Sequence, residues 1–314
     1  MNNPIGAMNP TNATVETARI VAVVAILLAP AVALAKDQSS APPPPANGAT
    51  PEAAVAPAPE AEGAELAKKL NNPISDLVSV PFQFNWENGI GNPDQTRFIL
   101  NVQPVMPFTL NEKWNLIARI VAPLISQVPI FTNGVGTSGI GDPLVSFFLS
   151  PAEGSITWGV GPALGLPSTH DPTLGSEKWA AGPTFVVLKQ RAGWTVGALA
   201  NQIWSFAGNP ARSAVNQMFL QPFVAYTTKD LWTIAVNSET TANWEVDSPN
   251  RWNVPVNFMV SKLSTFGTFP ASYQFGWGYF FAQPDSIGPA GEHSFGATWK
   301  VRGTITILLP KKKP

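Results

Sequence analysis

Residues 271–281 read ASYQFGWGYFF, in which the large side chains of Tyr273, Phe275 and Trp277 alternate with small or polar ones. Successive side chains of a β-strand point to opposite faces, so a period of two predicts a strand with one apolar face. The same alternation recurs in residues 78–86, 97–106, 155–166, 252–261 and 299–309. Weaker versions begin near Trp114, Gly141, Trp179, Trp194, Val215 and Trp232.

These segments predict about twelve strands of ~9 to 14 residues, the length that a tilted membrane strand requires. The second face carries Gly, Ala, Ser, Thr, Asn and Gln, and only 12% of the chain is charged. A soluble β-sandwich, the main alternative, would expose a face rich in Lys and Glu. We therefore expect an all-β fold, a closed antiparallel up-and-down transmembrane β-barrel.

The connections between these strands alternate between long and short. The long ones are residues 87–95, 126–138, 167–178, 207–214, 245–250 and 282–293. The short ones are residues 109–113, 150–154, 190–193, 228–230 and 264–268. Outer-membrane barrels have short periplasmic turns and longer extracellular loops. The pattern predicts the outer membrane of a Gram-negative bacterium, with both chain termini in the periplasm.

Eight tryptophans fall at the ends of predicted strands, where outer-membrane barrels carry aromatic girdles. The candidates for the outer girdle are Trp86, Trp179, Trp204, Trp244 and Trp252. Those for the inner girdle are Trp114, Trp194 and Trp232.

The N-terminal part of the chain does not share the alternation. Residues 1–35 end in an apolar run and a small-residue site, the pattern of a signal peptide. Residues 36–70 are rich in Pro and Ala and predict a disordered periplasmic linker with room for a short helix. The barrel should span residues 71–310, followed by a basic tail at residues 311–314.

The composition also bounds the partners. The net charge is −1, and no basic block precedes Lys311–Lys313, so we expect no nucleic acid partner. The chain has no cysteine, and no metal or cofactor motif is recognisable. Expected partners are outer-membrane lipid, the barrel-assembly machinery and a small-molecule solute, while the oligomeric state stays open.

The small or polar face predicts the residues that line the lumen. The candidates are Gln83, Asn85, Arg97, Asn101, Gln103, Asn115, Arg119, Glu239, Asn257, Gln274, Lys300 and Arg302. Barrel closure places the last strand beside the first, so the four cations should form one positive wall. We expect Glu239, on the ninth strand, to lie on the far side. Such a wall predicts mild anion preference, unless its cations pair with loop acids or brace a filled lumen.

A catalytic alternative rests on the two histidines in predicted outer loops. His170 lies beside Ser168 and Asp171, and His293 lies beside Ser294. A Ser-His pair near the outer leaflet could hydrolyse lipids. Nothing in the surrounding residues marks an activated nucleophile, so we do not expect an enzyme.

Several short motifs resemble a family of proteobacterial outer-membrane β-barrel proteins. They are NPISDLVSVPFQFN (72–85), LNVQPV (100–105), WNLIAR (114–119), GIGD (139–142), GVGP (159–162), NQIWSFAG (201–208) and LQPF (220–223). Members are labelled as transporters or as the outer-membrane component of a meta-pathway of phenol degradation. The resemblance covers about residues 65 to 310 and implies an outer-membrane barrel.

Two functional classes therefore remain. The first is a channel or uptake barrel that lets small solutes, hydrophobic or aromatic ones included, diffuse passively. The second is a barrel enzyme acting on lipids or a structural barrel with a filled lumen. Strand number does not decide between them, because ~8 strands enclose a packed interior and 16 to 18 leave an aqueous channel.

Overall fold

The computed structural model of the chain describes residues 59–91, 95–127, 129, 136–169, 171, 173–247, 250–267, 269–287 and 293–309. The predicted signal peptide, most of the predicted linker and the basic tail lie outside these residues. The described elements are α2 (Pro59–Leu70), β1 (Val78–Ile90), β2 (Gln95–Val102), β3 (Val105–Thr109), β4 (Trp114–Gln127), β5 (Thr137–Ile140), β6 (Leu144–Pro151), β7 (Thr157–Gly165), β8 (Lys178–Arg191), β9 (Trp194–Gly208), β10 (Asn216–Thr227), β11 (Trp232–Ser238), β12 (Thr240–Asn243), β13 (Trp252–Asn253), β14 (Pro255–Phe266), β15 (Phe269–Phe280), β16 (Asp285–Ile287), β17 (His293–Phe295) and β18 (Trp299–Leu309).

The strands form one closed ring. Each barrel strand pairs antiparallel with its neighbours in the chain, and β18 returns to pair with β1, with Val80 opposite Ile307. The pairs β2/β3, β5/β6, β11/β12 and β13/β14 each act as one strand with a short break, so the barrel has twelve strands. This confirms the predicted fold and excludes the two-sheet sandwich.

Two of the four breaks contain a proline. Pro104 separates β2 from β3, and its carbonyl still accepts a bond from the Ile120 amide at 3.1 Å. Gly141-Asp142-Pro143 separates β5 from β6. Proline has no amide hydrogen to donate to a neighbouring strand. Glu239 lies between β11 and β12, where its amide reaches the Pro255 carbonyl at 3.4 Å.

The two faces of the wall follow the sequence alternation. Phe275, on the outward face of β15, is 65% exposed, while its outward neighbours Tyr273 and Trp277 are also exposed. Asn257, on the inward face of the adjacent β14, is only 2% exposed. An apolar outer surface beside a polar interior is the arrangement that a lipid-facing barrel requires.

The tryptophans predicted as girdles lie on the outward face near strand ends. Trp86, Trp179, Trp194, Trp204, Trp232 and Trp244 are exposed. Trp114 and Trp252 are half-buried because each packs edge-on against another tryptophan, Trp158 and Trp244 respectively. Trp299 is exposed in the same way but was not among the predicted girdle residues.

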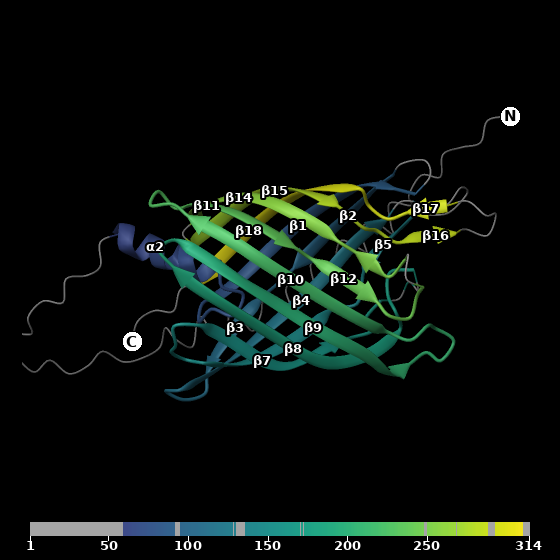
Figure 1. The fold of residues 1–314 in the computed structure, drawn as a ribbon, viewed down its shortest axis with the longest axis horizontal. Coiled ribbons are helices and arrows are strands. Elements are labelled where there is room, and N and C mark those ends of the chain that lie inside the picture. The colour runs from purple at the N-terminus through teal and green to yellow at the C-terminus, as the bar shows by residue number, and fades with distance from the viewer. Residues whose placement is uncertain are drawn as a thin grey trace, which may run out of the picture.

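The two ends of the barrel differ (Figure 1). One end carries the short connections and helix α2, and we refer to it as the inner end. The other carries most of the long connections and the hairpin of β16 and β17, and we refer to it as the outer end. The long connection predicted at residues 87–95 is wrong, because β1 continues to Ile90 and β2 begins at Gln95. No helix among the described residues is long and apolar enough to cross a membrane.

The assignment of faces can be tested with two neighbouring residues of β10. Leu220 is exposed on the outward face, whereas Gln221 lines the lumen. We expect Leu220→Arg to lower the free energy of unfolding in bilayers by about 2–4 kcal/mol, because it places a cation in hydrocarbon. Gln221→Arg should cost much less, since its side chain stays in a polar interior. Urea titration of both variants in lipid vesicles measures the difference, and equal costs would contradict the assignment.

Candidate functional site in the barrel lumen

The inner half of the lumen is filled by apolar side chains. Ile117, Phe148 and Val186 are almost completely buried, and they come from three different strands. The full cluster comprises Ile74, Val105, Ile117, Phe148, Val186, Leu188 and Leu199, with Phe219 and Phe223 packed against it. This packing fills much of the lumen toward the inner end, where a hollow of about 120 Å³ remains beside Arg119 and Gln103.

One member of the cluster comes from outside the barrel wall. Ile74 belongs to the segment 71–77 between α2 and β1, and it is 3% exposed. Gly159 of β7 leaves the space for it, since a Cβ built on Gly159 would lie 3.0 Å from Ile74 Cδ1. Ile74 therefore occupies the place that a side chain at position 159 would otherwise fill.

The segment that carries Ile74 is held at the inner end by a few polar contacts. Asn71 ends α2 by donating to the Ala67 carbonyl at 3.1 Å, and it also donates to Thr227 Oγ1 at 3.0 Å. Gln190 donates to the Lys68 carbonyl at 2.9 Å. A Cβ on Gly63 would lie 2.8 Å from Leu231 Cδ1, so α2 packs against the turn before β11. We refer to residues 59–77 as the inner plug.

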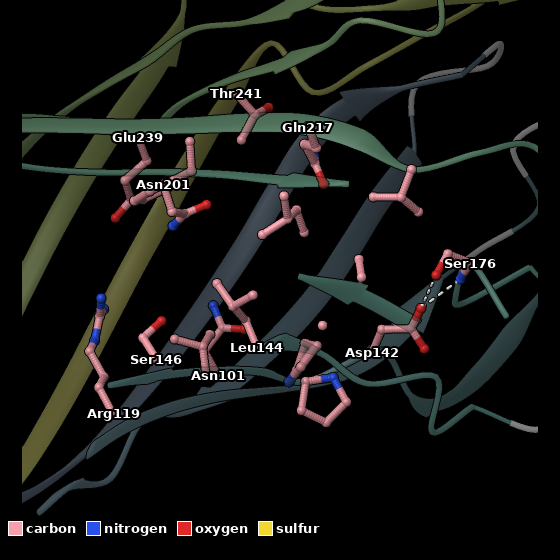
Figure 2. A pocket seen from close by; sticks show the side chains of 18 of the residues that line it. Asn101, Arg119, Asp142, Leu144, Ser146, Ser176, Asn201, Gln217, Glu239 and Thr241 are labelled. Atoms are coloured by element: carbon pink, nitrogen blue, oxygen red, sulfur yellow. Dashed lines mark hydrogen bonds between the residues drawn. The ribbon is translucent and has the colours of Figure 1, made fainter. Parts of the chain in front are cut away.

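The outer half of the lumen is hollow. A cavity of about 400 Å³ extends from Arg119 at its floor to Asp142 and Ser176 near the outer end (Figure 2). It shares Gln217 with two further hollows of about 370 and 650 Å³, which reach the outer connections. The cavity mixes amides such as Asn101 and Gln221 with apolar side chains. We refer to it as the lumen cavity.

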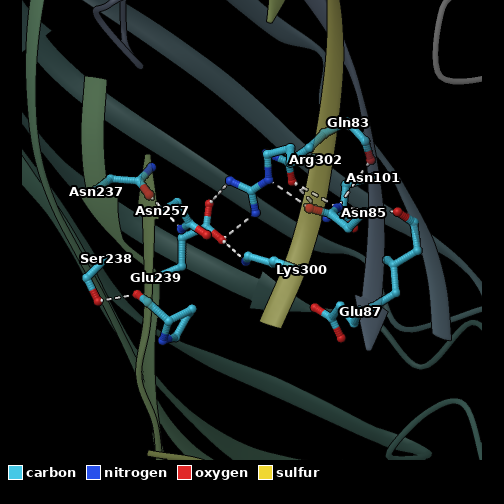
Figure 3. Close-up of polar contacts among 12 residues, drawn as sticks. Gln83, Asn85, Glu87, Asn101, Asn237, Ser238, Glu239, Asn257, Lys300 and Arg302 are labelled. Carbon is cyan, nitrogen blue, oxygen red and sulfur yellow. Dashed lines mark hydrogen bonds and ion pairs between the residues drawn. The ribbon is translucent and has the colours of Figure 1, made fainter. Parts of the chain in front are cut away.

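A buried ion cluster lies beside the lumen cavity (Figure 3). Glu239 accepts two bonds from Arg302, at 2.7 Å and 2.6 Å, and one from Lys300 Nζ at 3.1 Å. Lys300 and Arg302 are each 3% exposed. The expectation that Glu239 lies on the opposite side of the barrel from Lys300 and Arg302 is wrong, because its carboxylate bonds both of them. In the ring, β11 is separated from β18 only by β14 and β15. Two of the four cations of the expected positive wall therefore share a carboxylate.

A chain of amides connects this cluster to Arg119. Arg302 Nε donates to Asn85 Oδ1 at 2.7 Å, and Asn85 donates to Gln83 Oε1 at 3.4 Å. Gln83 Oε1 also accepts bonds from Asn101 at 3.1 Å and from Gln103 at 3.3 Å. Gln103 in turn accepts from Arg119 at 2.9 Å. One wall of the lumen is thus a continuous polar network.

The remaining predicted lumen residues lie away from the lumen cavity. Arg97 forms an ion pair with Glu87 at 2.6 Å, in agreement with the alternative that the cations of the wall pair with acidic residues. Asn257 donates to Asn237 at 2.7 Å, and Gln274 accepts from Thr304 at 3.3 Å. Asn115 lies near the inner end of β4 and is half-buried.

Sequence reasoning missed the apolar part of the lumen. Ile117 and Phe148 occupy inward positions near the inner ends of their strands. Large apolar residues at inward positions could have indicated in the sequence that this part of the lumen is filled. Ile74 had no such signal, because it lies outside every alternating segment. Asp142, which lines the outer end of the lumen cavity, lies in a strand break.

The structure describes only some of the residues of the predicted Ser-His pairs. His170 lies outside the described residues, as does the side chain of His293. Ser168 Oγ donates to the Gly141 carbonyl at 2.9 Å. Hydrogen bonds from Thr137 and, to a smaller extent, from Thr173 lower the pKa of Asp171. The carboxylate of Asp171 therefore connects its loop to the start of β5.

The ion cluster makes a prediction about stability. Glu239→Gln leaves Lys300 and Arg302 buried without their carboxylate, and losing one partner of a buried ion pair costs about 3–5 kcal/mol. We expect a loss of that size in the free energy of unfolding, measured by urea titration in vesicles. Asp76→Asn is the control and should cost at most about 1 kcal/mol, because its ion pair with Lys69 is exposed to solvent and such pairs contribute little. Equal effects would mean that the Glu239 cluster does not stabilise the barrel.

Comparisons with known proteins place this fold. No protein-family model and no curated protein sequence matches the chain. The COG4313 outer membrane channel from Pseudomonas putida F1 is similar in structure, with TM-score 0.55, 14% identity, and coverage of 74% of this chain and 95% of that one. The NanC porin matches at TM-score 0.45, with 10% identity over 73% of this chain and 98% of that one. The outer membrane phospholipase A from Escherichia coli matches at 0.40, with 12% identity over 74% and 90%. Identities this low carry the fold alone, which is a closed twelve-stranded antiparallel β-barrel similar to that of the COG4313 channel.

Proposed function

We propose that this protein is an outer-membrane channel for small solutes, which enter the hollow outer half of the lumen and pass inward when the inner plug moves. The observation that carries the proposal is the lumen cavity, with its mixed polar and apolar lining and its connection to the outer hollows. A barrel that served only as a scaffold would have no need for such a space. In this proposal the inner end, which carries α2, faces the periplasm.

The mixed lining favours solutes with both polar and apolar parts. Val121, Leu144 and Ile203 contribute apolar surface, whereas Asn201 and Gln217 offer hydrogen bonds. Ligand sites are typically concave and mostly apolar, with a few placed polar groups. Aromatic or otherwise hydrophobic solutes of small size fit this description, in line with the family that the sequence motifs resemble.

A second candidate function is a structural barrel with a filled lumen. The apolar cluster at the inner end favours it, because side chains from several strands fill much of the lumen there. The two candidates differ in whether the closure depends on Ile74. In a channel the plug can withdraw, whereas in a structural barrel the cluster remains closed without it.

Conductance in planar bilayers separates the two candidates. Ile74→Asp puts a carboxylate into the apolar cluster, and burying an unpaired charge is costly enough to expel the plug. We expect larger or more frequent current steps than in the unchanged protein. Ile74→Val is the control and should behave like the unchanged protein, because its smaller apolar side chain still fits beside Gly159. Silence from both the unchanged protein and Ile74→Asp would favour the structural barrel.

A reversible lock tests the plug directly, since the chain has no cysteine of its own. Asn71 Nδ2 and Thr227 Oγ1 are 3.0 Å apart, so Asn71→Cys with Thr227→Cys places two thiols within reach of a short crosslinker that contains a reducible disulfide. In the Ile74→Asp background we expect the crosslinked protein to conduct less and the reduced protein to recover the higher current. Conductance that does not respond to reduction would show that the plug is not the closing element.

A further inference from the structure

We infer that the lumen cavity binds small organic monocarboxylates with a compact apolar body, of about the size of benzoate, and that Arg119 holds the carboxylate. This inference rests on the proposed function, because it names the class of solute that the same cavity would accept. It is argued from the charges, the hydrogen bonds and the lining of the cavity.

Arg119 is the cation at the cavity floor that lacks an acidic partner. A guanidinium has five N–H donors and stays protonated in proteins. Arg119 donates one bond, to the neutral amide of Gln103, and no carboxylate within the described part of the chain forms an ion pair with it. Arg119 lines the lumen cavity and also a smaller hollow of about 120 Å³ beside the inner plug. Figure 2 shows its side chain at one end of the lumen cavity, directed toward the side on which Glu239 lies.

The nearest acid is already committed. Both oxygens of Glu239 receive bonds from Lys300 and Arg302, and Glu239 attracts Arg119 only at longer range, without a hydrogen bond or ion pair between them. The cluster of Arg119, Lys300, Arg302 and Glu239 carries an excess of positive charge. A wall with such an excess raises the local concentration of anions and stabilises a bound one.

Asp142, at the outer end, does not reverse this preference. Its Oδ2 accepts bonds from the amide and hydroxyl of Ser176 at 2.6 Å and 2.7 Å. Its Oδ1 accepts a bond from the Ser168 amide at 3.3 Å. A cationic ligand would thus find both acids of the cavity occupied, while an anionic one finds Arg119 available.

The rest of the lining indicates what else the anion carries. Asn101 and Gln221 lie among the lining amides and can bond a second carboxylate oxygen, while Leu144, Ile203 and Phe219 provide apolar surface. A fully polar anion such as phosphate would leave that surface without a partner. A cavity of about 400 Å³ also has the volume of a small-molecule site rather than of an ion site.

Equilibrium binding tests the inference without requiring conduction. Isothermal titration calorimetry of the full-length protein in detergent would compare benzoate with benzamide, which has the same ring but no charge. We expect benzoate to bind at least tenfold more tightly than benzamide, and inorganic phosphate to bind more weakly than benzoate. Equal affinities for benzoate and benzamide, or no benzoate binding, would overturn the inference.

Two variants locate the anchor. Arg119→Gln should weaken benzoate binding at least tenfold and leave benzamide binding nearly unchanged. Lys178→Gln removes the same charge at the outer end of the cavity and should weaken benzoate less than threefold. Heat-modified mobility on gels shows whether each variant folds, and the comparison of benzoate with benzamide stands even if Arg119→Gln does not. If the two variants weaken benzoate equally, Arg119 is not the anchor. A protein that binds benzoate but never conducts would contradict the channel and leave this site intact.

Discussion

The structure depends on closure of the β-sheet. A backbone N–H or C=O without a partner in hydrocarbon costs several kcal/mol, so a sheet can span a membrane only as a ring without edges. The pairing of β18 with β1 removes the last edge here. It also fixes the register that places Arg302 opposite Asn85, and so it determines which polar side chains face one another in the lumen. The alternation of the faces follows from the same ring.

Closure also explains how the lumen tolerates buried charge. Lys300 and Arg302 point inward because the outward face must be apolar, and once inside they need a carboxylate. Glu239 supplies it from three strands away, at a break between β11 and β12. The cluster fills that side of the lumen and leaves Arg119 as the cation at the floor of the lumen cavity, with Lys178 at its outer end.

The sequence predicted what depends on local periodicity. The strand phase, the alternation of long and short connections, and the outward tryptophans all follow from residues close together in the chain. It could not predict contacts across the lumen, because these depend on how far each strand is shifted against the next. Glu239 was therefore placed on the wrong side. The position of Ile74 was missed for a related reason. Its partner Gly159 is distant in sequence, and a glycine has no side chain that would indicate a contact.

The relation between the inner plug and the lumen cavity follows from two residues. Glycine inside a strand costs about 0.5–1 kcal/mol relative to alanine, and Gly159 leaves a void unless Ile74 fills it. A seated plug thus stabilises the wall, which in the proposed channel would favour the closed state. Phe219 packs against the apolar cluster that includes Ile74 and also lines the lumen cavity, so a solute bound there would touch a side chain that packs against this cluster. Any influence of the solute on the plug through Phe219 must be reciprocal. A solute that loosens the plug would itself bind more tightly once the plug has withdrawn, by the same factor.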